Sequence, residues 1–265
     1  MDDTRTTRTA GVLRDIARGG LSGLIAGVVV GGVGGRIVMA IIAQLNPDAF
    51  GMVTEAGEVI GRFTVPGTIA LIVFGGMSAG LVGAVLWVVV SPWVRGTGAR
   101  KSLLAMPIAV ALGTFILVES TNFDFEIVGP TWLVLVLLIG LVALTGAATA
   151  WLDDRLDRLL PRPVRPGRGV ALYGLVALLG TPALLITMLA FFDPGFSNGP
   201  TPFGVGPALL VPGVATAIWW ALRIRDGRTM PPRALVLAGQ IGLLVAVAFG
   251  FLHLWTEIGK IYAAQ

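Results

Sequence analysis

Long apolar runs alternate with short polar segments along the whole chain, and each run is long enough to form a membrane-spanning helix. A hydrocarbon core of about 30 Å is crossed by roughly 20 helical residues. Seven runs reach this length, with ends defined to within a few residues: 19–45, 66–91, 102–119, 130–152, 169–191, 204–222 and 234–256. The pattern predicts an all-α, polytopic integral membrane bundle, with a basic tail (1–18) before a seven-helix domain (19–265).

Composition points the same way. The 265 residues are 55% hydrophobic and only 13% charged, whereas a soluble domain carries about 25% charged residues. The chain has no cysteine, which excludes disulfides, thiolate metal sites and cysteine nucleophiles. The high hydrophobic fraction and the low charged fraction make the lipid bilayer the first partner to expect.

The positive charges lie mostly on one side of the predicted bundle. Of the 19 Lys and Arg residues, 16 fall in the tail or in the segments after the second, fourth and sixth spans. By the positive-inside rule the N-terminus is cytoplasmic and, with seven spans, the C-terminus is outside. Most tryptophans lie near span ends, as expected for rings that prefer the headgroup level. Because the arginines are confined to short loops, the pI near 10.3 does not indicate a nucleic-acid partner.

Glycines recur at every fourth position in the first span. Residues with this spacing form one slowly winding groove along a helix, the small-xxx-small pattern of close membrane-helix packing. One interpretation is packing within a single bundle. The other is a sliding or dimerising face for a second copy or another membrane protein. The stripe consists of Gly19, Gly23, Gly27, Gly31 and Gly35.

Arg36 is a permanent cation inside the same span. Counting about 1.5 Å per residue from Gly20 places it roughly 24 Å across a core of about 30 Å, in the outer third. Its guanidinium either snorkels to the interface or faces the bundle and pairs with a carboxylate. Glu119, at the end of the third span, is the preferred partner. Glu55 and Glu58 come next, in a segment (54–63) that could fold as a short interfacial helix.

Other candidate chemistry near the outer side is weaker. His253 and Glu257 lie four residues apart on one helical face and could form a proton relay or half of a metal site, but a lone interfacial histidine is the favoured interpretation. The segment 119–126 is rich in oxygen ligands but lacks EF-hand spacing. We therefore expect an acidic loop there, and we predict no metal or cofactor.

Two familiar activities are excluded by position. The sequence GLSG at 20–23 resembles the rhomboid serine-protease motif, but Ser22 and His253 lie near opposite membrane faces and cannot form a dyad. Seven spans also suggest a retinal protein, but Lys260 lies beyond the last span and cannot serve as a Schiff-base lysine.

Prolines predict irregular helices in the second half of the chain. Pro182 is expected to kink the fifth span, and Pro207 and Pro212 are expected to break the sixth. Broken spans are where transporters often bind substrate. Faint echoes between spans 1–3 and 5–7 also suggest a 3+1+3 parallel repeat.

No motif in the chain identifies a family, a substrate or a reaction. The absence of cysteine and of glycosylation sequons, with arginine-rich loops, favours a bacterial inner (plasma) membrane. Three function classes stay open: a small-solute or ion transporter with a polar site near the outer side, a non-catalytic scaffold or subunit packing through its first helix, and an enzyme that no motif supports. A polar cavity ending near Arg36 would favour transport, and a filled bundle with an exposed glycine groove would favour the scaffold.

Overall fold

The computed structural model describes residues 3–53, 59–62, 64–122, 124–162, 166–193 and 202–264. The chain is 84% helical, and within these ranges it contains no strand, only an isolated bridge between Val53 and Val59. Seven helical segments are long and apolar enough to cross a membrane: Thr4–Leu45, Val65–Trp93, Gly98–Ile116, Thr131–Leu159, Gly167–Phe192, Val205–Asp226 and Arg233–Ala263. These helices confirm the predicted all-α class and the seven candidate spans within the described residues, and they indicate a multi-pass membrane protein.

Several spans are composed of more than one element. The first consists of α1 (Asp3–Ala26), the π-helix η1 (Gly27–Gly34) and α2 (Gly35–Leu45). The second consists of α3 (Val65–Ala70), the π-helix η3 (Leu71–Met77), α4 (Ser78–Val90) and η4 (Ser91–Trp93). The third joins α5 (Gly98–Gly113) to η5 (Thr114–Ile116), and the fifth joins α8 (Pro166–Leu179) to α9 (Thr181–Phe192). The fourth, sixth and seventh are single helices: α7 (Thr131–Leu159), α10 (Val205–Asp226) and α11 (Arg233–Ala263).

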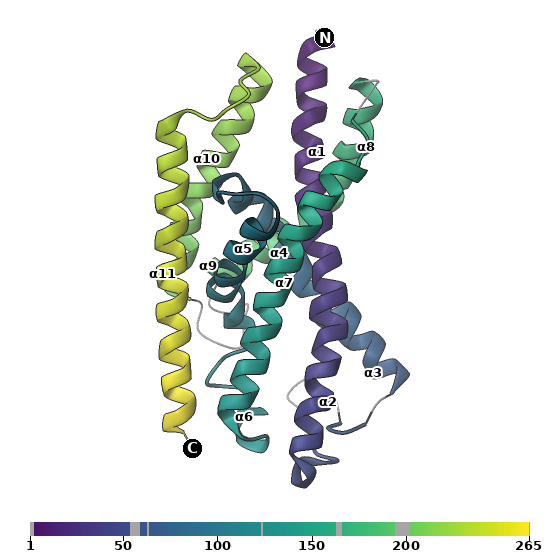
Figure 1. Cartoon of the computed structure of the whole chain (residues 1–265), viewed down its shortest axis with the longest axis vertical. Helices are drawn as coiled ribbons and strands as arrows, with labels where there is room; N and C mark the ends of the chain where they lie inside the picture. The colour runs from purple at the N-terminus through teal and green to yellow at the C-terminus, as the bar shows by residue number, and fades with distance from the viewer. Residues whose placement is uncertain are drawn as a thin grey trace.

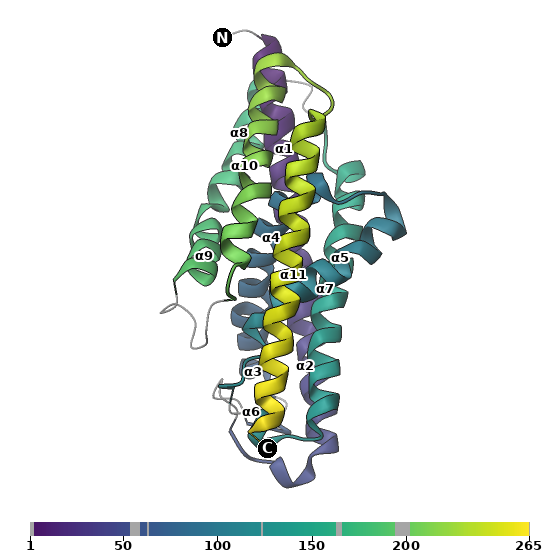
Figure 2. The same cartoon turned by 90° about the vertical axis from the view of Figure 1, so that its left-hand side faces the viewer.

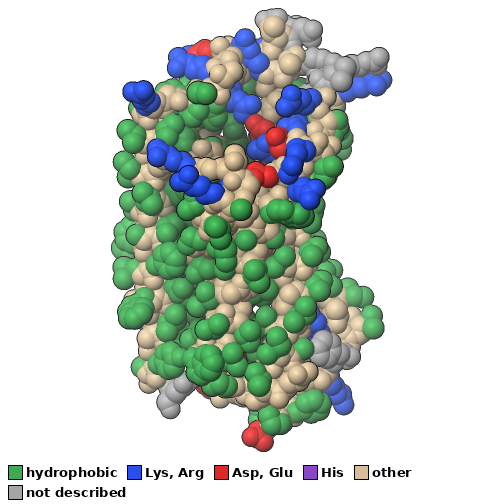
Figure 3. All heavy atoms as spheres, viewed as in Figure 1, with side chains coloured by type: hydrophobic (Ala, Val, Ile, Leu, Met, Phe, Trp, Pro, Cys, Tyr) green, Lys and Arg blue, Asp and Glu red, His purple; other side chains and the backbone are tan. Residues whose placement is uncertain are grey.

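The two ends of the bundle differ in charge. The basic end holds the N-terminus and the turns that follow α4, α7 and α10. The acidic end holds the C-terminus, η2 (Pro47–Ala49) and α6 (Asp124–Ile127) (Figures 1 and 2). Hydrophobic side chains cover the middle of the face in Figure 3, and charged side chains gather toward the ends. A belt of this kind matches a bilayer with polar headgroups on both sides.

The glycine stripe of the first span packs against the second span of the same chain. A Cβ added at Gly23 would meet the backbone of Ala84, and one added at Gly27 would meet the backbone of Gly80. Further along, Gly32 of η1 lies against Ile72 of η3. The absence of side chains therefore lets two helices cross with their backbones in contact.

The sixth span corrects the prediction from its prolines. It is one continuous helix rather than a broken one. Pro207 lies in the first turn, where a missing N–H costs no intrahelical hydrogen bond. Pro212 is fully buried, and its carbonyl accepts a hydrogen bond from Nε1 of Trp93 at 3.2 Å. A gap in the backbone ladder is tolerated where the helix is covered by protein.

The fifth span is the interrupted one. α8 ends at Leu179, Gly180 forms a turn, and Pro182 lies in the first turn of α9. The chain changes direction here because proline cannot continue the hydrogen-bonding of the preceding helix.

Candidate functional site

A cavity of about 970 Å³ lies among the first four spans, with α9 contributing one edge. On α7 its wall extends from Val134 to Thr149, about 22 Å of helix. Much of the lining is small or aliphatic, and a Cβ added at Gly146 of α7 would meet Ala109 of α5, so these two helices pack closely along one edge of the cavity. Small lining residues include Gly35, Gly75, Ala79, Gly83, Ala109 and Gly146.

The charged groups of this cavity are gathered at the acidic end. Arg36 comes from α2, Arg62 from the turn before α3, Glu119 from the segment after η5 and Asp124 from the start of α6, and the neutral Asn122 lies beside them. Along the remaining length the polar side chains are a few hydroxyl groups and the indole of Trp87. The cavity is thus amphipathic, with a charged end and an apolar body.

Arg36 is buried in this wall, with 8% of its surface exposed. One terminal nitrogen of its guanidinium donates a hydrogen bond to the carbonyl oxygen of Arg62 at 3.0 Å. The residue also lines a second hollow of about 360 Å³, on the outside of the bundle between α2 and the α3–η3 segment. The guanidinium therefore stands between the interior of the bundle and its membrane-facing surface.

Glu119, the predicted partner of Arg36, lines the same cavity. A direct ion pair between the two stays a prediction. Glu55 and Glu58 lie outside the described residues, and so does most of the segment in which a short helix was expected.

His253 and Glu257 lie away from the cavity. Glu257 is 1% exposed and accepts hydrogen bonds from the backbone N–H of Ser120 at 2.9 Å and from Nζ of Lys260 at 2.6 Å. The bond from Ser120 fastens the end of α11 to the segment after η5, whereas Lys260 lies on α11 itself. Nε2 of His253 is buried and has no hydrogen-bond partner among the described residues. The contacts of Glu257 are thus structural, and a relay with His253 stays a prediction.

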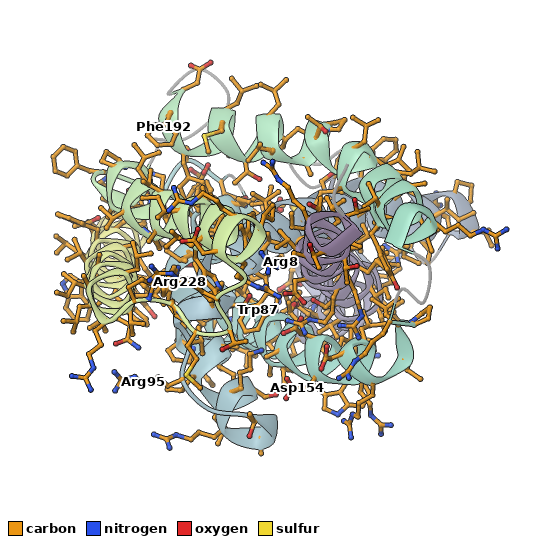
Figure 4. The ribbon with its side chains drawn as sticks, turned by 90° about the horizontal axis from the view of Figure 1, so that it is seen from above. Arg8, Trp87, Arg95, Asp154, Phe192 and Arg228 are labelled. Carbon is orange, nitrogen blue, oxygen red and sulfur yellow. The ribbon has the colours of Figure 1, made fainter. Side chains whose placement is uncertain are left out.

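The opposite, basic end of the cavity is closed by aromatic and charged side chains. Trp87 forms part of the wall and is 4% exposed. Viewed from the basic end, it lies near the middle of the bundle, whereas Arg95 points outward (Figure 4). Nζ of Lys101 lies 5.2 Å from the centre of the Trp87 ring, a cation–π distance.

An ion-pair cluster lies directly beyond Trp87, toward the basic end of the bundle. Asp153, one helical turn after the wall residue Thr149, is 1% exposed. It accepts hydrogen bonds from Nε of Arg18 at 2.8 Å and from Nζ of Lys101 at 2.7 Å. Asp157 accepts from Arg14 and Arg18, both at 2.8 Å. Arg223 of α10 pairs with Asp15 at 2.6 Å, which adds the sixth span to the first, third and fourth.

Sequence reasoning missed this cluster because it counted the cations of the basic end and not their partners. The spacing of the charged residues along each helix could have indicated the cluster. Arg14 and Arg18 are four residues apart, and so are Asp153 and Asp157, so each pair lies on one helical face. The missing information was that α1 begins at Asp3, which makes the basic tail part of the first helix.

Among the described residues no group of three or more His, Cys, Asp or Glu side chains could hold a metal ion. Comparison with known proteins finds no matching family model, no matching curated protein and no matching solved structure. The cavity and its two ends are therefore the features from which function is inferred.

Proposed function

We propose that this chain is a multi-pass transporter of a small amphipathic solute, bound in the cavity among spans 1–4. The observation that carries the proposal is the cavity itself. It is open space about 22 Å long, charged at the acidic end and closed at the basic end by Trp87 and the ion-pair cluster. With its charged end taken as the open side, such a cavity represents one state of an alternating-access cycle, in which breakable polar contacts close the other side.

The orientation follows from charge. The positive-inside rule puts the basic end in the cytoplasm and the C-terminus outside, and the absence of cysteine suits a bacterial inner membrane. The cavity then faces outward, and the ion-pair cluster is the closed cytoplasmic side.

The composition of the cavity narrows the solute. A hydrated ion or a sugar entering the apolar body would lose its water without gaining hydrogen bonds, which is costly. An amphipathic solute keeps its polar part at the charged end and its apolar part along the aliphatic wall. The sequence-based expectation of a small solute is therefore favoured over that of an ion.

The scaffold alternative has less support. A scaffold that packs through its first helix would have an exposed glycine groove. Gly19, Gly23 and Gly27 instead pack against α4 of the same chain. A second copy could reach these glycines only if α4 moved aside. The faint 3+1+3 repeat stays a prediction, which superposition of spans 1–3 on spans 5–7 would test.

Cysteine labelling tests the proposal directly because the chain has no native cysteine. Thr145 and Leu144 are neighbours on α7 at nearly the same depth. Thr145 lines the cavity, whereas Leu144 is 57% exposed on the outside of the bundle and does not line it. In right-side-out vesicles we expect a membrane-impermeant maleimide to label Thr145→Cys and not Leu144→Cys, since a thiol in lipid does not ionise.

The second half of the test opens the closed side. Lys101→Gln removes both the ion pair with Asp153 and the contact with Trp87, so labelling of Thr145→Cys from the cytoplasmic face should rise. Purified protein in liposomes should also show solute flux that Arg36→Ala reduces. A Thr145→Cys variant that is labelled from neither side would instead favour a filled, non-transporting bundle.

A further inference from the structure

We infer that the solute is a phosphate-headed membrane lipid, whose phosphate is bound by Arg36 and whose acyl chain lies in the cavity. This inference rests on the proposed function and names the substrate class of the same site. It follows from the shape of the cavity, the chemistry of its charged end and the route by which that end is reached.

The shape suits an acyl chain. The wall on α7 is about 22 Å long, and half of a hydrocarbon core of about 30 Å is about 15 Å. A lipid chain therefore fits along the cavity with its head at the acidic end. A volume of about 970 Å³ is at the upper end of the range for drug-sized ligands, more than a single small polar solute would fill.

The charged end can hold an oxyanion through Arg36. Glu119 and Asp124 line the same end, so the phosphate of a bound lipid takes the place predicted for Glu119 at the guanidinium. Arg36 is held in the wall by its bond to the Arg62 carbonyl, and a guanidinium presents a planar fork of donors that matches phosphate oxygens. The positive charge of the guanidinium favours an anionic group over a neutral one.

The route to Arg36 starts at the membrane-facing surface. The second hollow is lined by Val33, Ile37 and Ile41 of the first span together with Thr68 and Ile72 of the second. Ile37 is 58% exposed, on a surface that would contact lipid tails. Arg36 and Ala40 line both this hollow and the large cavity. A lipid of the surrounding leaflet can thus reach the guanidinium without leaving the hydrocarbon region.

Binding of defined lipids to delipidated, detergent-purified protein tests the assignment, with native mass spectrometry as the readout. The matched probes are dioleoyl phosphatidic acid and dioleoylglycerol, which share their chains and differ in the phosphate. We expect the wild-type chain to prefer the phospholipid by about tenfold or more, the range expected for charge-assisted hydrogen bonds. Arg36→Gln should lose this preference, and Arg100→Gln, an exposed arginine at the basic end, should keep it.

Two further variants keep the test decisive if Arg36→Gln does not fold. Arg36→Lys retains the charge but not the fork and should weaken the preference. Ala40→Phe fills the space between the two hollows and should reduce binding of both lipids without touching the guanidinium.

Three results would overturn the assignment: equal binding of the two lipids by the wild-type chain, a preference unchanged in Arg36→Lys and Arg36→Gln, or displacement of the lipid by millimolar inorganic phosphate. The last would identify free phosphate as the ligand. Failure here is separable from failure of the transporter proposal, because labelling of Thr145→Cys reports access to the cavity whichever solute the cavity binds.

Discussion

Arg36 illustrates how far a single residue can be interpreted from sequence. A cation in an apolar run is costly, so the sequence was enough to mark Arg36 as a candidate site and to place it in the third of the span near the acidic end. Its hydrogen bond to the carbonyl of Arg62 was not predictable. That contact depends on how the segment after α2 folds back, and no local pattern encodes it.

The coupling of Arg36 to Glu119 is a testable prediction at this scale. Both line the charged end of the cavity, so removing either charge should change the stability effect of removing the other. In a double-mutant cycle of Arg36→Gln and Glu119→Gln, followed by thermal denaturation in detergent, we expect a coupling of about 0.5 kcal/mol or more. Glu126→Gln, an exposed acid of α6, is the control and should be additive with Arg36→Gln. Additivity with Glu119→Gln as well would disprove the pairing.

At the scale of elements, hydropathy was sufficient to identify all seven spans, because a bilayer demands long apolar helices whatever their packing. It could not identify the π-helical turns of η1 and η3, which form where two glycine-rich helices cross. The prolines gave a mixed result. Pro207 and Pro212 were expected to break the sixth span, which is continuous, whereas the fifth span is interrupted at Gly180, two residues before Pro182. The cost of a proline depends on its place in the helix and on what covers it.

The crossing of the first two spans makes a prediction about two glycines of the first span, Gly27 of η1 and Gly20 of α1. Gly27→Ala places a methyl group against the backbone of Gly80, which cannot give way as a flexible side chain can. We expect a loss of about 1 to 3 kcal/mol, as for other overpacked interiors. Gly20→Ala is the matched control because nothing lies within 4 Å of the added Cβ. It should leave stability unchanged or raise it by up to about 1 kcal/mol through helix propensity. Equal losses in both variants would contradict the close crossing.

For the whole molecule, the structure has three parts: the charged end of the cavity around Arg36 and Glu119 (the mouth), its apolar body (the chamber) and the ion-pair cluster around Asp153 (the closure). The mouth could be expected from the sequence, because acids collect in the predicted outer loops. The chamber could not, since empty space between helices depends on the side chains of several spans at once. The closure was missed because its members come from four spans that meet only in the folded bundle.

The closure should contribute strongly to stability. Asp153→Asn leaves Arg18 and Lys101 facing a neutral group in a buried site. Removing one partner of a buried ion pair costs about 3 to 5 kcal/mol, so thermal denaturation in detergent should show a large fall in midpoint. Asp226→Asn, whose pair with Arg225 lies at the surface, should cause little change. Equal, small shifts would mean that the cluster is solvated rather than buried.

The length of the first span has a mechanical consequence. Thr4–Leu45 is 42 residues of unbroken helix, roughly 63 Å at about 1.5 Å per residue. Arg18 in the closure and Arg36 at the mouth are thus two points on one rod, about 27 Å apart. Between them lies η1, where the backbone is already wound more loosely than an α-helix. A displacement of the Arg36 guanidinium is therefore transmitted along the helix to Arg18 and its partners Asp153 and Asp157 only if the π-helical turns of η1 keep their register. The stiffness of η1 thus determines whether the two ends of the cavity move together.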